Sequence, residues 1–196
     1  MNKISDIYTT EYFTGHQFYR DTYIKLAQMF YDVLKPKSVL DVGCGAGFMM
    51  EYFAHLIPTH GIDGSEATKA VSRVSNMIEI QDLRTPVELH KMWDMVLSIE
   101  VAEHIEPQFA DNYVSILTRH AENKILMTSA GVGQGGTSHV NCQPKEYWIK
   151  KIENAGFKYD KETTDLITAK AKEIILNDKC PIHYLVNNFA VYERVV

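Results

Sequence analysis

Short apolar runs that contain β-branched residues alternate along the chain with segments whose apolar residues recur every three or four positions. The first pattern is typical of buried strands and the second of helices that pack on a sheet. This alternation predicts an α/β fold with a parallel sheet. The expected strands span residues 39–42, 59–63, 77–81, 93–99 and 124–129, with a strand pair or one long strand over 184–195. The expected helices span residues 48–56, 66–74, 107–121, 144–155 and 161–176.

Residues 5–36 precede the first strand and are rich in aromatic side chains. Apolar residues from Tyr19 to Val33 follow helical spacing, and Pro36 is expected to end that helix. The aromatic cluster between Tyr8 and Tyr19 fits two interpretations, packing in the core or a cover over a ligand site, because aromatic rings bury well in both. We therefore expect one domain over residues 1–196, with a helical cap over 1–36 and a core over 37–196.

Composition and charge narrow the class of protein. The chain has 196 residues, of which 45% are hydrophobic and 23% charged, as in ordinary globular domains. The formal net charge of −5 gives no general attraction to nucleic acid or to a membrane surface. No apolar run approaches the roughly 18 residues of a membrane span. Three cysteines without metal-type spacing, and no secretion signal, predict reduced thiols and a cytoplasmic location.

The segment with the clearest chemistry follows the first expected strand. Gly43, Gly45 and Gly47 stand at alternate positions between that strand and a helix, and Asp41 precedes them. A strand, a glycine turn and a helix form the frame that holds nucleotide-like ligands at the carboxyl end of a parallel sheet. The spacing differs from the G-x-G-x-x-G pattern of dinucleotide sites, and a carboxylate beside the turn suits an ammonium group better than a pyrophosphate.

This stretch closely resembles the first motif of the class I methyltransferases that use S-adenosylmethionine (SAM). The resemblance covers about residues 37–130 and implies a Rossmann-like three-layer sandwich, with a mostly parallel seven-stranded sheet and an antiparallel last strand. It also implies SAM as the cofactor, with its amino-acid end near Asp41. Cys44 occupies a position in the turn where the family often has a small residue, and we interpret it as a filler.

Further cofactor contacts are expected at the ends of the next strands. Asp63 lies twenty positions after Gly43, where an acidic residue accepts hydrogen bonds from the ribose hydroxyls. The resemblance implies that Asp82 receives the adenine amino group and that the backbone N–H of Leu83 meets the ring. Capping of a helix is the other interpretation of Asp82. The resemblance also assigns further residues to the cofactor site: Gly43, Cys44, Gly45, Gly47, Gly64 and Ile99.

Two histidines are candidates for the general base that an alcohol acceptor needs. His139 lies in a glycine-rich loop over residues 130–143, which we expect to act as a mobile lid over the site. His104 follows the strand that ends near residue 99, and simple packing is an equally good interpretation of it.

A metal ion is a further hypothesis. Glu100, Glu103 and His104 have the i, i+3 and i, i+4 spacing that shares one helix face, and His139 is a possible fourth ligand from the loop. This set resembles that of metal-assisted O-methyltransferases and would suit Mg²⁺ or Mn²⁺. The alternative is that the glutamates are solvated residues at a helix start, favoured there by the helix dipole.

Three functions remain open from the sequence. The first is a transferase that methylates a hydroxyl of a small molecule, a sugar or an aromatic. The second is a 2′-O-methyltransferase of RNA ends, which predicts a basic groove, with Lys145, Lys150, Lys151 and Lys158 along one edge. The third is a SAM-binding protein without activity. Methylation of nucleic-acid bases is disfavoured for two reasons. The (Asn/Asp)-Pro-Pro-aromatic turn of the methylases that act on amino groups is absent after residue 99. The Pro-Cys nucleophile of cytosine C5 methylases is also absent, since the pair Cys180-Pro181 has the reverse order and lies far downstream.

Overall fold

The computed structural model describes residues 4–195 and has an α/β architecture with three layers. Met1–Lys3 and Val196, which belong to the expected cap and core, lie outside the described residues. A seven-stranded sheet stands in the middle, in the order β3-β2-β1-β4-β5-β7-β6. The strands are β1 (Val39–Val42), β2 (Thr59–Asp63), β3 (Ile78–Ile80), β4 (Trp93–Ser98), β5 (Ala121–Met127), β6 (Phe157–Tyr159) and β7 (Ala190–Arg194).

Strands β1 to β5 pair in parallel, and β7 runs antiparallel to both β5 and β6. The expected fold class is therefore confirmed. The long C-terminal strand is wrong in extent, because Tyr184 lies in a 3₁₀ turn, His183–Asn187, and only Ala190–Arg194 joins the sheet. The strand that completes the sheet beside it is β6, a three-residue edge strand just after Gly156 that the sequence pattern was too short to reveal.

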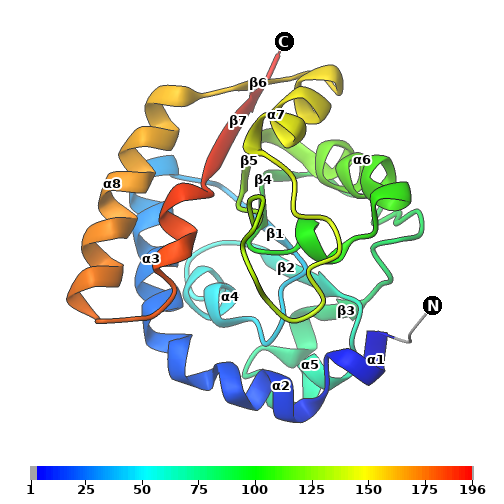
Figure 1. The fold of residues 1–196 in the computed structure, drawn as a ribbon, viewed down its shortest axis with the longest axis vertical. Coiled ribbons are helices and arrows are strands. Elements are labelled where there is room, and N and C mark those ends of the chain that lie inside the picture. Colours follow the sequence, from blue (N-terminus) through cyan, green and yellow to red (C-terminus); the bar gives the residue numbers. More distant parts are fainter. Residues whose placement is uncertain (1–3, 196) are drawn as a thin grey trace.

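Helices cover both faces of the sheet (Figure 1). The α-helices are α1 (Ile4–Ile7), α2 (Thr10–Gly15), α3 (Arg20–Leu34), α4 (Phe48–Phe53), α5 (Ala67–Val71), α6 (Ala110–His120), α7 (Lys145–Asn154) and α8 (Lys161–Asn177). The 3₁₀ turns are His16–Tyr19, Ser75–Met77, Ala102–His104, Pro107–Phe109 and His183–Asn187. One core cluster joins α3, α4 and α8 to one face, and a second joins α6 and α7 to the other.

The long helices form for reasons visible in the sequence. Helix α3 buries Leu26 and Phe30 completely and ends where Lys35 adopts a left-handed conformation just before Pro36. Helix α8 begins where the Asp160 side chain accepts a hydrogen bond from the backbone N–H of Thr163. Among residues 4–195, no helix combines the length and the apolar character needed to cross a bilayer.

Two parts of the fold cover the carboxyl ends of the parallel strands, where ligands bind in open α/β sheets. One is the N-terminal segment from α1 to the first 3₁₀ turn. The other is the loop between β5 and α7, coloured yellow-green in Figure 1, which has neither helix nor strand over residues 130–143, as expected. Both contribute walls to a single cavity.

Candidate functional site

The glycine turn after β1 has a backbone that only glycine accommodates easily. Gly43, Gly45 and Gly47 all have positive φ angles, of 76°, 52° and 73°. A Cβ atom added to Gly43 would lie 2.4 Å from the Val101 side chain, so this position is closed to other residues by space as well as by conformation. The turn exposes its backbone to a ligand at the carboxyl end of β1.

Asp63, at the end of β2, holds the turn in place. One carboxylate oxygen accepts the N–H of Gly45 at 2.9 Å, and the other accepts the N–H of Ser65 at 2.9 Å. Burial raises the pKa of Asp63, while these backbone donors act in the opposite direction. Each oxygen keeps a further lone pair, so the side chain can accept hydrogen bonds from ligand hydroxyls without releasing the turn.

Asp41 has no Lys, Arg or His partner among the described residues 4–195. Its side chain is only 5% exposed, and burial together with the neighbouring Asp63 carboxylate raises its pKa to about 8. A carboxyl group in this position is mostly protonated at neutral pH, and a cationic ligand nearby would favour the ionised form. The side chain therefore suits an ammonium or a sulfonium group.

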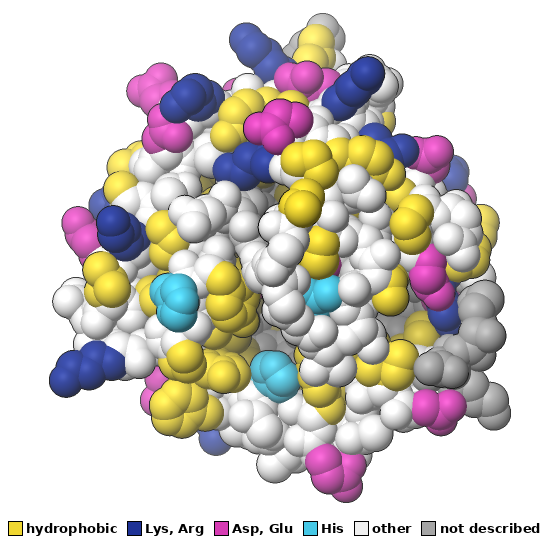
Figure 2. All heavy atoms as spheres, in the orientation of Figure 1, with side chains coloured by type: hydrophobic (Ala, Val, Ile, Leu, Met, Phe, Trp, Pro, Cys, Tyr) yellow, Lys and Arg dark blue, Asp and Glu magenta, His cyan; other side chains and the backbone are white. Residues whose placement is uncertain are grey.

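The glycine turn opens into a cavity of about 550 Å³ that reaches the loop over residues 130–143. The space-filling view shows a hollow near the centre of this face, bordered by hydrophobic and histidine side chains (Figure 2). The residues expected from the sequence to contact ligand or cofactor that do line it are Asp41, Gly43, Cys44, Gly45, Asp63, Gly64, Asp82, Leu83, Ile99, Glu100, His104 and His139. Gly47 and Glu103 do not: Gly47 caps the N-terminus of α4, and Glu103 is fully buried.

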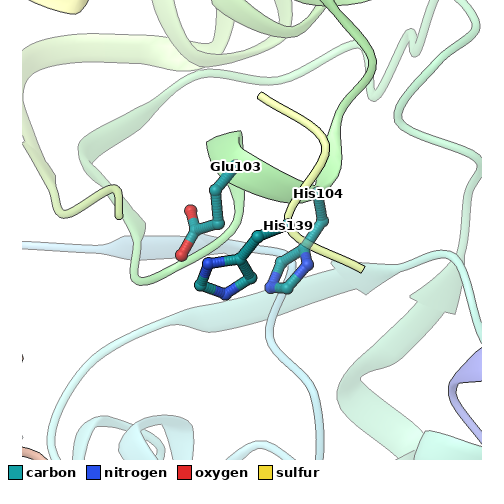
Figure 3. A group of neighbouring side chains, drawn as sticks. All are labelled: Glu103, His104 and His139. Carbon is teal, nitrogen blue, oxygen red and sulfur yellow. The ribbon is translucent and has the colours of Figure 1, made fainter. Parts of the chain in front are cut away.

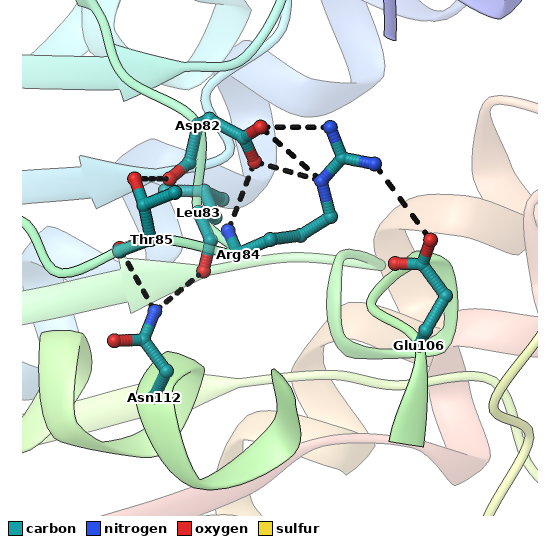
Figure 4. Close-up of polar contacts among 6 residues, drawn as sticks. All are labelled: Asp82, Leu83, Arg84, Thr85, Glu106 and Asn112. Atoms are coloured by element: carbon teal, nitrogen blue, oxygen red, sulfur yellow. Dashed lines mark hydrogen bonds and ion pairs between the residues drawn. The ribbon is translucent and has the colours of Figure 1, made fainter. Parts of the chain in front are cut away.

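Asp82 lies in a fixed turn after β3 (Figure 4). Its carboxylate accepts hydrogen bonds from Arg84 Nε and Nη2, at 2.9 and 2.7 Å, and these bonds hold its pKa below the ordinary value. Arg84 also pairs with Glu106, at 3.7 Å. From α6, Asn112 Nδ2 donates to the Leu83 carbonyl at 3.0 Å and to another carbonyl of the turn. Side-chain hydrogen bonds therefore hold the turn from both sides without a ligand.

Across the cavity, the structure brings Glu103, His104 and His139 together (Figure 3). Their ligand atoms lie within 4.8 Å of one another, although His139 comes from a loop far along the chain. Nδ1 of His104 lies 3.3 Å from the Ser138 carbonyl, and Nδ1 of His139 lies 3.0 Å from the Gln134 carbonyl. Carbonyl oxygens only accept, so each Nδ1 carries the proton and each Nε2 keeps its lone pair.

The Glu103 carboxyl group is fully buried, and neither oxygen has a hydrogen-bond partner within residues 4–195. Burial and the nearby Glu100 carboxylate raise its pKa well above the ordinary range. Such a group needs a proton or a cation to be stable. Beside it, a Cβ atom at Gly136 would lie 2.1 Å from His139 Nε2, so the missing side chain leaves space next to that nitrogen.

Glu100 departs from the expected ligand set. The sequence interpretation placed it on one helix face with Glu103 and His104, but only a three-residue 3₁₀ turn, Ala102–His104, forms there. Glu100 precedes that turn with a φ of 52°, and its carboxylate accepts hydrogen bonds from Gln134 and Asn188. The shared helix face is wrong, and the close group consists of the other three residues.

The aromatic cluster near the N-terminus lines the cavity through Tyr8, Tyr12 and His16, which is the position that a cover over a ligand site requires. The Tyr8 ring meets the rings of Tyr12 and His104 edge to face, at centroid distances of 5.2 and 5.6 Å. Tyr184 adds a further aromatic wall that sequence reasoning missed. One hint of Tyr184 was present in the sequence, an aromatic residue in a segment that we expected to be a strand.

Comparisons with known proteins agree with this geometry. Residues 40–120 match a family model described as a methyltransferase domain. A cyclopropane-fatty-acyl-phospholipid synthase of Escherichia coli K12 is 29% identical over 126 residues, which cover 60% of this chain and 31% of that protein. A ubiquinone biosynthesis O-methyltransferase of Shewanella sp. ANA-3 is 33% identical over 82 residues, 37% of this chain and 35% of that one. The matches thus span about a third of the length of these curated relatives.

Solved structures share the fold at low sequence identity. CalS10, an amino pentose methyltransferase from Micromonospora echinaspora with bound SAM, has a TM-score of 0.62 at 14% identity, covering 90% of this chain and 92% of that one. The magnesium protoporphyrin IX methyltransferase of Synechocystis PCC 6803, with bound S-adenosylhomocysteine (SAH), has a TM-score of 0.60 at 18% identity, covering 74% and 75%.

Proposed function

We propose that the chain is a class I SAM-dependent methyltransferase, as the family-model match over residues 40–120 supports, and that it transfers the methyl group of SAM to a hydroxyl of a small molecule. One observation carries the proposal: a single cavity joins the glycine turn and Asp63 at one end to the two histidines at the other. A donor at the first end and an acceptor at the second would meet inside it. The O-methyltransferase from Shewanella, by its name, adds support for a hydroxyl target.

In this proposal, SAM lies across the end of β1. Its ammonium group meets the Asp41 carboxylate, its ribose hydroxyls meet Asp63, and its adenine lies against the turn of Asp82 and Leu83. The high pKa of Asp41 supports the first contact, because a bound cation would compensate a buried carboxylate that is otherwise protonated. The hydrogen-bonded turn after β3 supports the last one, since it needs no reordering when the ring binds.

Methyl transfer is an in-line displacement. The acceptor oxygen bonds to the methyl carbon as the carbon–sulfur bond breaks, and the electron pair of that bond stays on sulfur. The donor is already activated, so the protein chiefly aligns the three atoms and accepts the hydroxyl proton. We assign the proton to Nε2 of His139. Burial lowers the pKa of His104 to about 4, which makes that imidazole a poor proton acceptor at neutral pH.

A divalent cation held by Glu103, His104 and His139 is the second candidate for the same step. The unpartnered Glu103 carboxyl, the free Nε2 atoms and the space beside Gly136 fit such an ion. Of Mg²⁺ and Mn²⁺, two imidazoles favour Mn²⁺. When bound, the cation would lower the pKa of an acceptor hydroxyl. His139 Nε2 cannot bind a cation and accept a proton at once, so the two candidates exclude one another.

The charge of the cavity wall argues against an RNA acceptor. Among the described residues, Arg84 is the one Lys or Arg side chain that lines the cavity, and Asp82 and Glu106 already engage it. None of the four lysines of the expected basic edge lines it, and Lys151 is paired with Asp111. A neutral or cationic acceptor suits this wall better than a phosphate backbone.

Transfer from methyl-labelled SAM to a panel of catechols, other phenols, sugars, amines and RNA tests the proposal. We expect label in a hydroxyl compound, loss of transfer in His139→Ala with SAM affinity retained, and no change in His55→Ala, an exposed histidine away from the cavity. A Mn²⁺ titration by electron paramagnetic resonance separates the two candidates, since only a metal site would lose binding in His139→Ala. SAM binding with no transfer to any compound would favour the silent SAM-binding alternative.

A further inference from the structure

Three polar side chains from distant parts of the chain form a closed hydrogen-bonded ring at the edge of the cavity. Gln134 Nε2, from the lid loop, donates to Glu100 at 2.9 Å. Asn188 Nδ2, just before β7, donates to Glu100 at 3.1 Å and to Gln134 Oε1 at 3.0 Å. The ring ties the loop to the end of β4 and to the segment that leads into β7.

Gln134 also controls the surroundings of His139 through its backbone. Its carbonyl oxygen lies 3.0 Å from His139 Nδ1 and accepts a longer bond from the Cys142 thiol, at 3.5 Å. The side chain of Gln134 is therefore fixed by the ring, while its carbonyl fixes the imidazole. Movement of this one residue would disturb the orientation and the protonated nitrogen of His139 together.

The rest of the loop offers few other anchors. Near its end, the backbone N–H groups of Val140 and Asn141 donate to the Glu103 carbonyl, at 2.9 and 3.0 Å. In the first half, a Cβ atom at Gly131, Gly133 or Gly135 would meet nothing within 4 Å, so the chain is loosely packed there. The ring of Glu100, Gln134 and Asn188 is thus the main side-chain attachment of the first half of the loop.

The conformation of Glu100 agrees with a dedicated role. It is a residue other than glycine with a φ of 52°, a strained conformation that persists when surrounding bonds hold it. Its backbone N–H donates to Thr128 Oγ1 at 2.9 Å, and its carboxylate receives two amide donors. This arrangement aims the carboxylate at the loop.

We propose that Glu100, Gln134 and Asn188 form a latch that holds the lid loop against the end of β4 and fixes His139 with its proton on Nδ1. These are positioning residues, which act through His139 and not on the substrate. The inference rests on the proposed function in one respect, the role of His139 in methyl transfer. The latch itself is a property of the protein without ligand.

An exchange of the two side chains tests the latch. Gln134→Glu places two carboxylates in contact. Glu100→Gln replaces the carboxylate that accepts both amide donors, so three amide groups then face one another. The double variant Glu100→Gln/Gln134→Glu again pairs one amide with one carboxylate, and Asn188 can still donate to both. We expect each single variant to break the ring and the double variant to restore it. Far-UV circular dichroism checks that all three fold, and Gln134→Ala replaces any single variant that does not.

Two readouts need no acceptor. The first is amide hydrogen exchange at the loop N–H groups that are hydrogen-bonded, those of Gln134, Val140 and Asn141. We expect their exchange to quicken about 10- to 100-fold in the single variants and to return to the wild-type rate in the double variant. The second is the long-range ¹H–¹⁵N spectrum of the His139 ring. It should show the Nδ1-protonated tautomer in the wild type and the double variant, and an averaged mixture in the single variants.

Unchanged exchange and an unchanged tautomer in the single variants would overturn the latch. Disruption that the double variant fails to reverse would overturn it too, because Glu100 would then act as a charge at its own position. If the latch behaves as expected but His139→Ala still transfers methyl groups, the latch stands and the role of His139 in transfer falls.

Discussion

The buried carboxyl of Asp41 makes ligand binding depend on pH in a way that can be worked out in advance. Its pKa in the free protein is about 8, so roughly one molecule in two is ionised at pH 8, about one in ten at pH 7 and about one in a hundred at pH 6. If binding needs both the ionised carboxylate and the protonated ammonium group of SAM, affinity falls about 20-fold from pH 8 to pH 6, because part of the ammonium charge is already lost at pH 8. Above pH 8 it falls again, because a free α-amino group loses its proton with a pKa of about 7.7–8.0.

Equilibrium dialysis with labelled SAM at half-unit steps between pH 6 and 9 measures this profile. Asp41→Asn keeps the shape of the side chain without the charge, so it should bind more weakly at pH 8 and show little dependence between pH 6 and 7. Asp32→Asn, on the far surface of α3, should match the wild type. A wild-type affinity that is flat between pH 6 and 8, or an Asn variant that keeps the wild-type slope, would refute the contact between Asp41 and the ammonium group.

The same shift has a consequence for stability, with a sign opposite to that of a salt-bridged aspartate. The folded pKa lies above the ordinary value of 3.8, so between about pH 4 and pH 8 the folded state holds more protons than the unfolded state. The free energy of unfolding therefore falls as the pH rises through that window, by at most about 5 kcal/mol. Asp41→Asn should be more stable than the wild type at pH 8 in urea unfolding without ligand, and equal stability at pH 8 would count against the buried charge.

Three further outcomes follow from the geometry. Gly136→Ala should displace the His139 ring and lower methyl transfer by up to about 100-fold without loss of stability. Gly135→Ala has open space around its Cβ atom and should transfer normally, so equal activity of the two variants would contradict the role of the space beside His139. Asp63→Asn can keep only one of the two charge-assisted bonds that Asp63 accepts, from Gly45 of the glycine turn and from Ser65 after β2. It should weaken SAM binding about 10- to 100-fold in the same dialysis assay, and an unchanged affinity would exclude its role. Phe30→Ala removes a fully buried ring on the side of α3 that faces the sheet, and it should lower the free energy of unfolding in urea by about 3–5 kcal/mol. A loss below about 1 kcal/mol would be inconsistent with the core described.

The parts of the site that the sequence predicted are those fixed by local chain geometry. The turn from Gly43 to Gly47 and the acidic end of β2 at Asp63 follow from residues next to one another in sequence, and the structure has both where expected. A parallel sheet then brings these strand ends to one edge whatever the loops do. The fold class was predictable for the same reason.

The parts that were missed depend on contacts between distant segments. Glu100 has the spacing of a helical partner of Glu103, yet its backbone is held in a left-handed conformation by Thr128 and its carboxylate is used by Gln134 and Asn188. No local pattern encodes those partners. Tyr8 likewise has an aromatic side chain that suits a core or a cavity wall, and only its position beside His104 decides between them.

The most direct test of the central claim is a calorimetric titration of the purified protein with SAH at pH 8, where the Asp41 carboxylate is half ionised. A cofactor that lies across the glycine turn between Asp41 and Asp63 predicts saturable heat with one site per chain and competition by SAM. The absence of saturable heat for both compounds would contradict the account.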